Sequence, residues 1–561
     1  MERKRRFCRQ HPAEGKLYCG NHQHLEPPGL SKSSLAPESD DIIPNQKQSN
    51  QPAKKRKRIP CPVDPSHTIF QDMVEKHIRV CPRAKKRKRQ EDEPYFLENL
   101  NCGGHGITCS GSNPTLETGS AQWAQQIARR VLQVHQSVFL GNTQLETLDV
   151  SALTFDDIHN ALPMKDLSQP EMDAGILKGF QSHRIKTGGR RHIPQLASLI
   201  GHLREMNVLA DITEDDAAKK PWQQCTLLEP GSPTLSSPTK SNDNHPLVFL
   251  EMGAGRGMFG LTAVGVANAT CFANDNQPPY LIMVERAGSR SKADKVLRSI
   301  PMDAETSYLK LENVKWSRHC CDLSHVNLPV LLQDNKFKNA KVVVIAKHLC
   351  GVGTDLALKS MESIREKVSA CILATCCHGI CEWQHYVGRD DLRQLMEQTE
   401  ISNGKISGGS LSFGPAEFDL LRRWCAASVA NAPDAEKDTT VNTGDASNEG
   451  SEDPLDMEHE PCSPAGKATR DSDDASSSSS ATSVSSIVRA LDLRCGIQGL
   501  GRACQRLIDY GRYRYLRNQM FPVTDDINKK VLVNLTHYVG PDVTPQNAAL
   551  WAFRETEIQQ S

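Results

Sequence analysis

The feature that most constrains this chain is a series of short apolar runs separated by longer mixed segments. The runs follow residue 246 and read VFLEM, YLIMVE, VVVIA and ACILAT. Runs of this length, rich in Val, Ile and Leu, are typical of buried strands, and their alternation with helix-length segments is typical of a mostly parallel sheet with crossover helices. We therefore predict an α/β domain over residues 246–430, with its C-terminal part over residues 486–540.

A glycine-rich turn follows the first run, in the segment VFLEMGAGRGMFG. A strand, a glycine turn and a helix N-terminus in succession are typical of ligand-binding sites. A phosphate loop, G-x-x-x-x-G-K-[ST], fits Gly255 and Gly260, but Leu261 stands where the lysine is needed. A dinucleotide turn, G-x-G-x-x-G, is disfavoured because Met258 takes the place of the third glycine.

The remaining pattern is E-x-G-x-G-x-G, formed by Glu251, Gly253, Gly255 and Gly257. A carboxylate here would repel a pyrophosphate, but it suits a cationic ligand such as the amino acid end of S-adenosylmethionine. The glycines allow the backbone to approach that ligand closely. The pattern therefore favours S-adenosylmethionine as cofactor; the alternative is an ordinary strand–helix turn with solvated acids.

Two further acidic residues follow later strands of the predicted sheet. Glu285 ends YLIMVE, a position where a carboxylate can accept both ribose hydroxyls of an adenosine. Asp322, in HCCDL, is a candidate hydrogen-bond partner for the adenine ring at the end of another strand. A glycine turn accompanied by acids at two strand ends indicates a nucleoside-type cofactor more strongly than the turn alone.

Candidate catalytic residues follow the run VVVIA, because ligands of open α/β sheets bind at the carboxyl ends of the strands. Methyl transfer from such a cofactor to a hydroxyl group requires removal of the hydroxyl proton and alignment of its oxygen with the methyl group. Lys347 is predicted to be the base or to orient the hydroxyl, since a lysine desolvated beside a cationic cofactor has a lowered pKa. His348 is the competing base, because the reference pKa of histidine is close to neutrality.

A cysteine-rich segment follows the run ACILAT. It contains Cys376, Cys377, His378 and Cys381, which are candidate zinc ligands. Adjacent ligands at a strand end suit tetrahedral geometry poorly, and buried free cysteines are common, so we favour free thiols here. No spacing of Cys, His and an acid indicates a nucleophilic cysteine.

A metal module is predicted in CPVDPSHTIFQDMVEKHIRVC, with the ligands Cys61, His67, His77 and Cys81 separated by five, nine and three residues. The last step, four positions along a helix, places His77 and Cys81 on one helical face. Two thiolates and two imidazoles complete a tetrahedral zinc site, and such a site can supply most of the folding energy of a small module.

A second Cys/His module lies near the N-terminus, in CRQHPAEGKLYCGNH. It offers four zinc ligands, Cys8, His11, Cys19 and His22, and His24 is also within reach.

Residues 1–89 carry 21 Lys and Arg against 9 Asp and Glu, a net charge of +12 that indicates a polyanionic partner. Two KKRKR runs in this arm fit nuclear import, phosphate contact or solvated linker charge.

The rest of the chain divides by composition and periodicity. Helical spacing recurs in WAQQIARRVLQVHQSVF and in IPQLASLIGHLREMNVL, and residues 431–474 carry a net charge of −10, from 3 basic and 13 acidic residues. The predicted units are a Cys/His module over 1–24, a basic linker over 25–58, the CHHC finger over 59–82, a basic and polar linker over 83–120, a helical region over 121–210, a linker over 211–245, the α/β domain over 246–430, a disordered acidic and Ser-rich insertion over 431–485, and the rest of the α/β domain over 486–540.

Length and cysteine usage set the remaining limits. A chain of 561 residues allows two to four structural units. No apolar run approaches the roughly 18 residues of a spanning helix, so we expect no membrane partner. Nineteen cysteines without an apolar leader favour free thiols or metal ligands, and hence a reducing compartment, the nucleus or the cytoplasm.

These motifs occur in a recognisable order. KRRFC with YCGNH, the CHHC finger, FLEMGAGRG, AKHLCGVGTDLAL, CCHGICEWQHYVG and CQRLIDYGRYRYL together resemble the eukaryotic tRNA ribose methyltransferase family, also called tRNA:m4X modification enzymes. The resemblance covers both Cys/His modules and the segments from about 190 to 430 and from about 485 to 540.

The resemblance implies a Rossmann-like methyltransferase domain that uses S-adenosylmethionine. It implies methylation of the 2′-hydroxyl of the fourth acceptor-stem nucleotide, with tRNAs for glycine, proline and histidine as substrates. Family members carry a CCCH first module whose leading cysteine lies upstream of KRRFC, so here either His11 or His24 substitutes for it or the module is truncated.

Two other functional classes compete with this interpretation. A noncatalytic zinc-finger RNA adaptor is one, because the CHHC type also occurs in a spliceosomal protein; a damaged glycine turn would favour it, and the turn here is intact. A nicotinamide oxidoreductase is the other, and Met258 disfavours it. The resemblance implies tRNA as partner, and the residues indicate no particular protein.

Overall fold

The structure is a computed structural model of the full chain. It describes residues 57–63, 67–102, 118–141, 149–164, 189–209, 246–270, 278–287, 292–298, 314–397, 411–429, 482–522 and 529–556. The chain divides into two compact units, Met1–Arg83 and Ala84–Ser561. Along the described parts of the chain, no helix combines the length and apolar character needed to cross a membrane.

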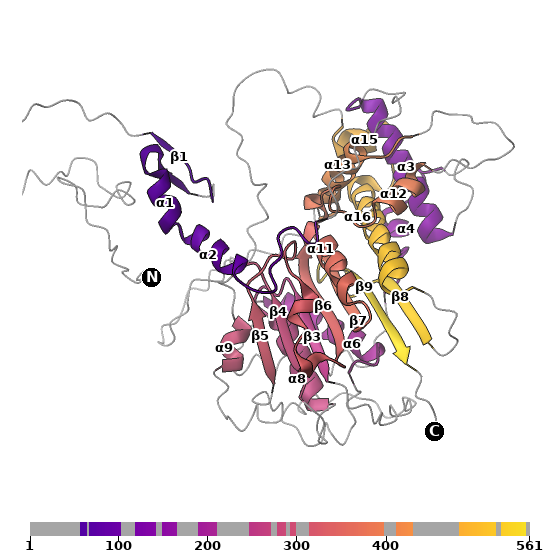
Figure 1. The fold of residues 1–561 in the computed structure, drawn as a ribbon. Coiled ribbons are helices and arrows are strands. Elements are labelled where there is room, and N and C mark those ends of the chain that lie inside the picture. Colours follow the sequence, from indigo (N-terminus) through magenta and orange to yellow (C-terminus); the bar gives the residue numbers. More distant parts are fainter. Residues whose placement is uncertain are drawn as a thin grey trace, which may run out of the picture. The chain divides into compact units, whose positions relative to one another are not determined.

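The described part of the first unit is a small hairpin followed by a helix (Figure 1). Strands β1 (Arg58–Pro60) and β2 (Thr68–Phe70) pair antiparallel, with Ile59 opposite Ile69. A 3-10 turn leads into helix α1 (Val74–Val80). Helix α2 (Pro82–Glu91) begins just before the division between the two units.

The second unit is built on a seven-stranded sheet (Figure 1). The strands are β3 (Leu247–Met252), β4 (Tyr280–Val284), β5 (Lys315–His319), β6 (Lys341–Cys350), β7 (Val368–Cys376), β8 (Lys529–His537) and β9 (Ala548–Thr556). Their order is β5-β4-β3-β6-β7-β9-β8, and β9 pairs antiparallel with both of its neighbours whereas the other pairs are parallel. The predicted mostly parallel sheet is confirmed.

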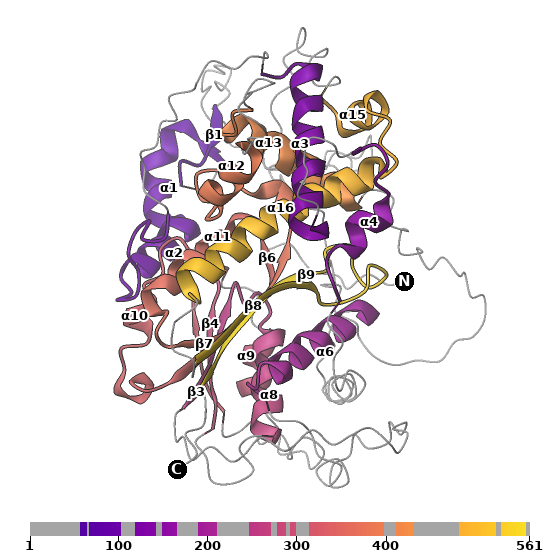
Figure 2. The ribbon, with the colours of Figure 1, turned by 90° about the vertical axis from the view of Figure 1, so that its right-hand side faces the viewer.

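Helices cover both faces of this sheet, so its central strands are apolar on both sides. In β3, Phe249 packs into one face cluster, whereas its neighbours Val248 and Leu250 pack into the other. Figure 2 shows the helices on the two sides. The first face is covered by α6 (Gly189–Glu205), α8 (Met258–Thr270) and α9 (Lys292–Arg298), and the second by α10 (Leu328–Leu331), α11 (Val352–Met361) and the end of α16 (Gly496–Tyr515).

A helical layer packs around the first part of α16 and forms a third apolar cluster. Its helices are α3 (Ala121–Leu140), α4 (Phe155–Asn160), α12 (Arg389–Glu397), α13 (Pro415–Trp424) and α15 (Val484–Ala490). Helix α3 begins where the Ser120 side chain accepts the Trp123 N–H and ends at Gly141, which has a left-handed conformation. The short turns of the unit are η8 (Asn335–Phe337), η9 (Glu362–Ile364), η10 (His378–Ile380), η11 (Cys425–Val429) and η12 (Leu516–Met520).

The structure distributes the predicted units differently in three places. The helices of the segment 121–210 do not form a region of their own, because α3 and α4 pack with α16 while α6 packs on the sheet. The segment 83–120 begins with α2 and continues into an anchored stretch that includes Tyr95 and Asn101. The sheet also continues past residue 540 to Thr556, and most of the predicted insertion, 431–481, lies outside the described residues.

Candidate active site and metal sites

The glycine turn joins β3 to α8 through three residues in left-handed conformations. Gly253, Gly255 and Gly257 have φ angles of 61°, 51° and 74°. At Gly257 a Cβ atom would also lie 2.7 Å from the Met283 sulfur and 2.8 Å from Arg318 Nη2. Only glycine meets both requirements, so the spacing seen in the sequence follows from the shape of this turn.

Glu251 lies beneath the turn, at the end of β3. It is 3% exposed, and a Cβ atom on Gly260 would lie 2.6 Å from its Oε2 atom. Burial raises the pKa of the Glu251 carboxyl to about 8, because a charged carboxylate is poorly solvated there. Oε2 has no hydrogen-bond partner among the described residues. Burial thus favours the protonated form of this carboxyl.

Glu285 follows β4 and holds the glycine turn against it. Its Oε2 accepts the Gly255 N–H at 2.8 Å, and its Oε1 accepts the Ala287 N–H at 2.8 Å. The Glu285 N–H donates to the carbonyl of His319 at 3.0 Å, which links the ends of β4 and β5. The half-buried carboxylate keeps lone pairs for further donors, since each carboxylate oxygen can accept two hydrogen bonds.

An ion pair that the sequence analysis did not identify supports the turn from below. Arg318 of β5 donates to Asp294 of α9 at 2.7 Å and to the Gly255 carbonyl at 3.1 Å. The side chains of Arg318 and Asp294 are only 10% and 6% exposed, so the ion pair is largely excluded from solvent. Three elements meet here that lie far apart along the chain, which is why no local motif revealed the pair.

Asp322 lies in the loop after β5. Its Oδ1 accepts the backbone N–H of Ser324 at 3.0 Å and the Ser324 hydroxyl at 2.9 Å, so this oxygen fixes a local turn. The end of α2 and the residues after it contact β5 and the same loop: the Gln90 amide donates to the Cys320 carbonyl at 2.8 Å, and the Tyr95 ring lies edge-on to His319. This contact explains why the predicted linker is structured.

Lys347 and His348 lie at a bulge near the end of β6. Lys347 pairs with Ala374 and Leu349 pairs with Thr375, so His348 is the additional residue, with a φ of 61°. Bulges and left-handed non-glycine residues are enriched at functional sites. The bulge borders the glycine turn, because a Cβ atom on Gly253 would lie 2.5 Å from Leu349 Cδ1.

A third side chain, from helix α6, joins the two predicted catalytic residues. The Nζ atom of Lys347 lies 3.0 Å from Nδ1 of His192, and the rings of His192 and His348 lie 6.1 Å apart. His192 precedes Lys347 by 155 positions and has no motif around it, so sequence reasoning missed it. The three residues place two imidazoles and one amine at the same edge of the sheet as the glycine turn.

The cysteine-rich segment after β7 separates into two environments. The Nε2 atom of His378 lies 2.8 Å from Asp509, whose carboxylate also pairs with Arg512, and these three side chains are buried. The Sγ atom of Cys381 lies 3.2 Å from Arg512 Nη2. His378 and Cys381 therefore belong to the buried ion-pair network, whereas Cys376 and Cys377 lie with Cys350.

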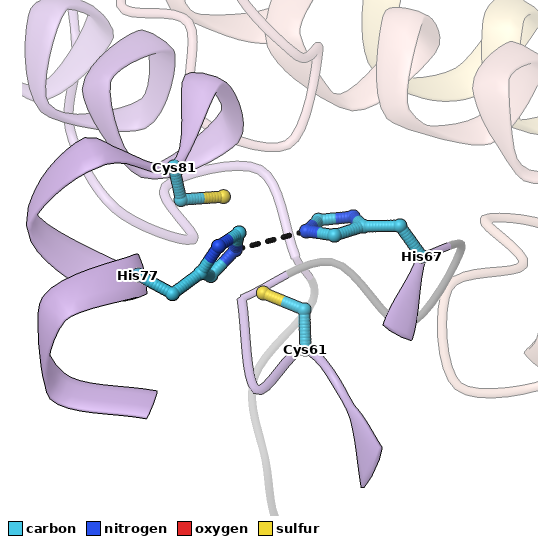
Figure 3. Close-up of side chains that lie close together, drawn as sticks. All are labelled: Cys61, His67, His77 and Cys81. Atoms are coloured by element: carbon cyan, nitrogen blue, oxygen red, sulfur yellow. Dashed lines mark hydrogen bonds between the residues drawn. The ribbon is translucent and has the colours of Figure 1, made fainter. Parts of the chain in front are cut away.

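The four predicted ligands of the CHHC finger face one another (Figure 3). Their ligand atoms all lie within 4.8 Å, and the Nε2 atoms of His67 and His77 are 2.9 Å apart. Cys61 and Cys81 are buried, and the Cys81 N–H closes α1 by donating to the His77 carbonyl. Two thiols and two imidazoles this close fit a tetrahedral zinc ion. The first module, with Cys8, His11, Cys19, His22 and His24, lies outside the described residues.

Comparison with known proteins matches three family models to this chain. The model described as Methyltransferase TRM13 matches residues 194–553, the U11-48K-like CHHC zinc finger matches residues 58–82, and the CCCH zinc finger in TRM13 protein matches residues 1–23. The CCCH match falls on the predicted first Cys/His module, and the CHHC match falls on the predicted finger.

Several curated relatives span most of the chain. The tRNA:m(4)X modification enzyme TRM13 of Saccharomyces cerevisiae is 23% identical over 76% of this chain and 77% of its own length. The homologue of Homo sapiens is 23% identical over 98% of this chain and 93% of its own length. The enzyme of Kluyveromyces lactis is 26% identical over 66% of this chain and 70% of its own. The chain therefore belongs to the TRM13 methyltransferase family.

Proposed function

We propose that this protein is a tRNA 2′-O-methyltransferase that uses S-adenosylmethionine and modifies the fourth nucleotide of the acceptor stem. The observation that carries the proposal is the meeting of two parts at one sheet edge: the glycine turn above Glu251, and the Lys347–His192 pair beside it. The relatives' name, tRNA:m(4)X modification enzyme, supports the substrate and the nucleotide. By the family resemblance, the tRNAs are those for glycine, proline and histidine.

The strand order supports a Rossmann-like methyltransferase fold. Numbered from β3, the first five strands run 3-2-1-4-5, the order of a doubly wound sheet. The order reverses between β3 and β6, and ligands of such sheets bind at the carboxyl ends of the strands on either side of that reversal. Glu251 is the last residue but one of β3, and Lys347 lies near the end of β6.

The residues around the turn fit S-adenosylmethionine. Three left-handed glycines leave backbone without side chains for a ligand to approach, and the buried Oε2 of Glu251 has no partner among the described residues. Gly253, Gly255 and Gly257 would hold the amino acid end, Glu285 would accept the ribose hydroxyls, and Asp322 would meet the adenine ring. When bound, the cofactor supplies an electrophilic methyl group.

Lys347 and its neighbours would prepare the acceptor. His192 lies within hydrogen-bond reach of Lys347, so a proton can be shared between the amine and the imidazole. Lys347 is the proposed base, or the group that orients the ribose hydroxyl, and His348 is the competing base beside it. The bulge at His348 fixes the direction of both side chains relative to the glycine turn.

The two N-terminal Cys/His modules would bind the RNA. Zinc at Cys61, His67, His77 and Cys81 would hold the finger folded, and a second zinc is proposed for Cys8, His11, Cys19 and His22. The basic arm would contact phosphates, and a duplex acceptor stem would be recognised by its shape and its 2′-hydroxyls, because A-form RNA hides its major-groove base edges. We propose the nucleus or the cytoplasm, both reducing, as its location.

A second candidate function is RNA binding without catalysis. The observation in its favour is that residues 58–82 match the family model of a U11-48K-like CHHC zinc finger, which is named after a different protein. A finger of this type can serve an adaptor as well as an enzyme. The retained glycine turn and the Lys347–His192 pair favour the enzyme.

The direct test is transfer of tritium from labelled S-adenosylmethionine to bulk tRNA, followed by mapping of the labelled nucleoside. We expect a 2′-O-methylated nucleoside at acceptor-stem position four, in a minority of tRNAs. Label on a base rather than a ribose would refute the proposed chemistry. Stable tRNA binding with no transfer under any condition would favour the adaptor.

A further inference from the structure

Three cysteine side chains converge where β6 and β7 end. Cys350 and Cys376 are register partners on these parallel strands, and their Sγ atoms lie 3.4 Å apart. Cys377, the next residue, completes the group, in which all three sulfur atoms lie within 4.8 Å of one another. Two motifs, KHLCG and CCHG, that are separate in the sequence thus contribute to one cluster.

The backbone around the cluster holds the thiols in place. Cys377 has a φ of 50°, an unfavourable conformation for a residue with a Cβ atom. Gly351, directly after Cys350, has a φ of 50°, and a Cβ atom there would lie 2.9 Å from the Ile380 carbonyl oxygen. The loops after the two strands are therefore closely packed, which fixes the separation of the thiols to within the freedom of their side chains.

We propose that Cys350, Cys376 and Cys377 form a binding site for a thiophilic metal ion, with Zn²⁺ as the expected occupant. Zinc–sulfur bonds of about 2.3 Å place two sulfurs of a tetrahedron about 3.8 Å apart. The Cys350–Cys376 sulfur separation of 3.4 Å is close to this value, and all three sulfur atoms lie within 4.8 Å of one another. An all-sulfur ligand set selects zinc or copper(I) over magnesium, calcium or manganese.

The buried histidine of the same segment, His378, is not one of the ligands of this cluster. The Nδ1 atom of His378 has no hydrogen-bond partner among the described residues, although the side chain is 3% exposed. Its other ring nitrogen lies 2.8 Å from Asp509, so the buried ion-pair network fixes the orientation of this ring. Three protein thiolates leave one position of a tetrahedron, which a water molecule would fill.

The alternative use of these thiols is a disulfide between Cys350 and Cys376. That bond would employ two of the three sulfurs and leave Cys377 without a role, whereas a metal ion employs all three. The metal would fasten the end of β6 to the end of β7 just beyond the bulge that carries Lys347 and His348. The site is independent of the CHHC finger, which lies in the other unit.

The test is the zinc content of the purified full chain, measured per protein molecule after dialysis against a weak chelator. Cys376→Ser and Cys377→Ser should each lose one zinc equivalent relative to the wild type. Cys371→Ser is the matched control, because Cys371 is buried on the same strand and lies outside the cluster. Cys61→Ser should lose a different equivalent, so that Cys61→Ser combined with Cys377→Ser loses two.

A second measurement needs no variant. Cys350 and Cys377 are partly exposed, so in the wild type iodoacetamide should alkylate them slowly with zinc bound and at least tenfold faster after a strong chelator removes it. Equal zinc content in the wild type and both serine variants would overturn the proposal. So would alkylation rates unchanged by the chelator, or a Cys350–Cys376 disulfide in the freshly purified metal-free chain.

Discussion

In the candidate site, the pKa of the Glu251 carboxyl departs far from its ordinary value. Its carboxyl is buried beneath the glycine turn, and its pKa is raised to about 8, whereas an exposed glutamate titrates near pH 4.5. The folded chain therefore holds this proton more tightly than the unfolded chain. Its contribution to stability is complete below about pH 4.5 and is lost as pH rises through about 8.

Glu251→Gln, which cannot ionise, tests this behaviour. From pH 5 to pH 9 the wild type should lose on the order of a few kcal/mol of unfolding free energy relative to the variant. Denaturant unfolding at a series of pH values measures the difference. Glu366→Gln, a change at an exposed glutamate, should follow the wild type throughout. A difference between wild type and Glu251→Gln that does not depend on pH would show that the carboxyl is not desolvated.

Lys347 is the residue on which the proposed chemistry depends most. Lys347→Ala should lower the rate of methyl transfer by about a factor of 10²–10⁴, the usual contribution of a positioned acid or base, and leave cofactor affinity nearly unchanged. Single-turnover transfer and cofactor titration measure the two effects separately. Lys338→Ala, at an exposed lysine, should retain full activity. Loss of cofactor binding without a separate chemical defect would contradict the assigned role.

At the scale of elements, the glycine turn shows how backbone shape and packing act together. Gly257 and Gly141 have nearly equal φ angles of 74° and 71°, but a Cβ atom on Gly257 would meet Met283, Ala293 and Arg318, whereas one on Gly141 would meet nothing within 4 Å. Alanine substitutions at these two positions therefore separate the free-energy cost of the left-handed conformation from the cost of a steric clash.

Substitution by alanine at both positions uses this contrast. Gly141→Ala should cost roughly 1 kcal/mol of unfolding free energy, from its left-handed conformation alone. Gly257→Ala should cost clearly more and should also weaken S-adenosylmethionine binding by at least tenfold, because Ala293 and Arg318 must move. Unfolding curves and calorimetric titration report both values. Equal costs at the two positions, with unchanged cofactor affinity, would contradict the assigned packing.

The parts of the structure that the sequence predicts are those that depend on local patterns of residues. The glycine turn, the central strands β3, β4, β6 and β7, and the CHHC ligands follow from local patterns of glycine, apolar residues and ligand spacing. His192, Arg318 and the Cys350–Cys376 contact depend on elements brought together only by the sheet order. The sequence analysis also does not identify strands β8 and β9, whose positions depend on the pairing of β9 with β7 and of β8 with β9.

At the scale of the whole molecule, the chain consists of two units with separate sources of stability. The finger is too small to rely on an apolar core, so we expect its folding to depend on a metal ion bound by Cys61 and its three partners. The second unit has three extended apolar clusters and a buried ion-pair network. In that network burial opposes ionisation of Asp509, but His378 and Arg512 outweigh it and lower its pKa to about 2.

Loss of the finger metal should therefore affect RNA binding and spare the catalytic unit. Cys61→Ser should weaken tRNA binding by at least tenfold, while S-adenosylmethionine affinity and the main unfolding transition remain those of the wild type. Filter binding of tRNA, calorimetric titration and thermal unfolding give the three readouts. Cys102→Ser, at a cysteine outside both clusters, is the matched control. Unchanged tRNA binding in the zinc-free finger would contradict the proposed role of this module.

The central claim is that the glycine turn binds a cationic cofactor above the buried carboxyl of Glu251. Calorimetric titration of the full chain with S-adenosylmethionine near pH 7, in two buffers of different ionisation enthalpy, tests it most directly. Binding should release part of a proton in the wild type, because the sulfonium compound favours the charged form of Glu251, and none in Glu251→Gln. Binding of NAD in preference to S-adenosylmethionine, or of neither, would contradict the claim.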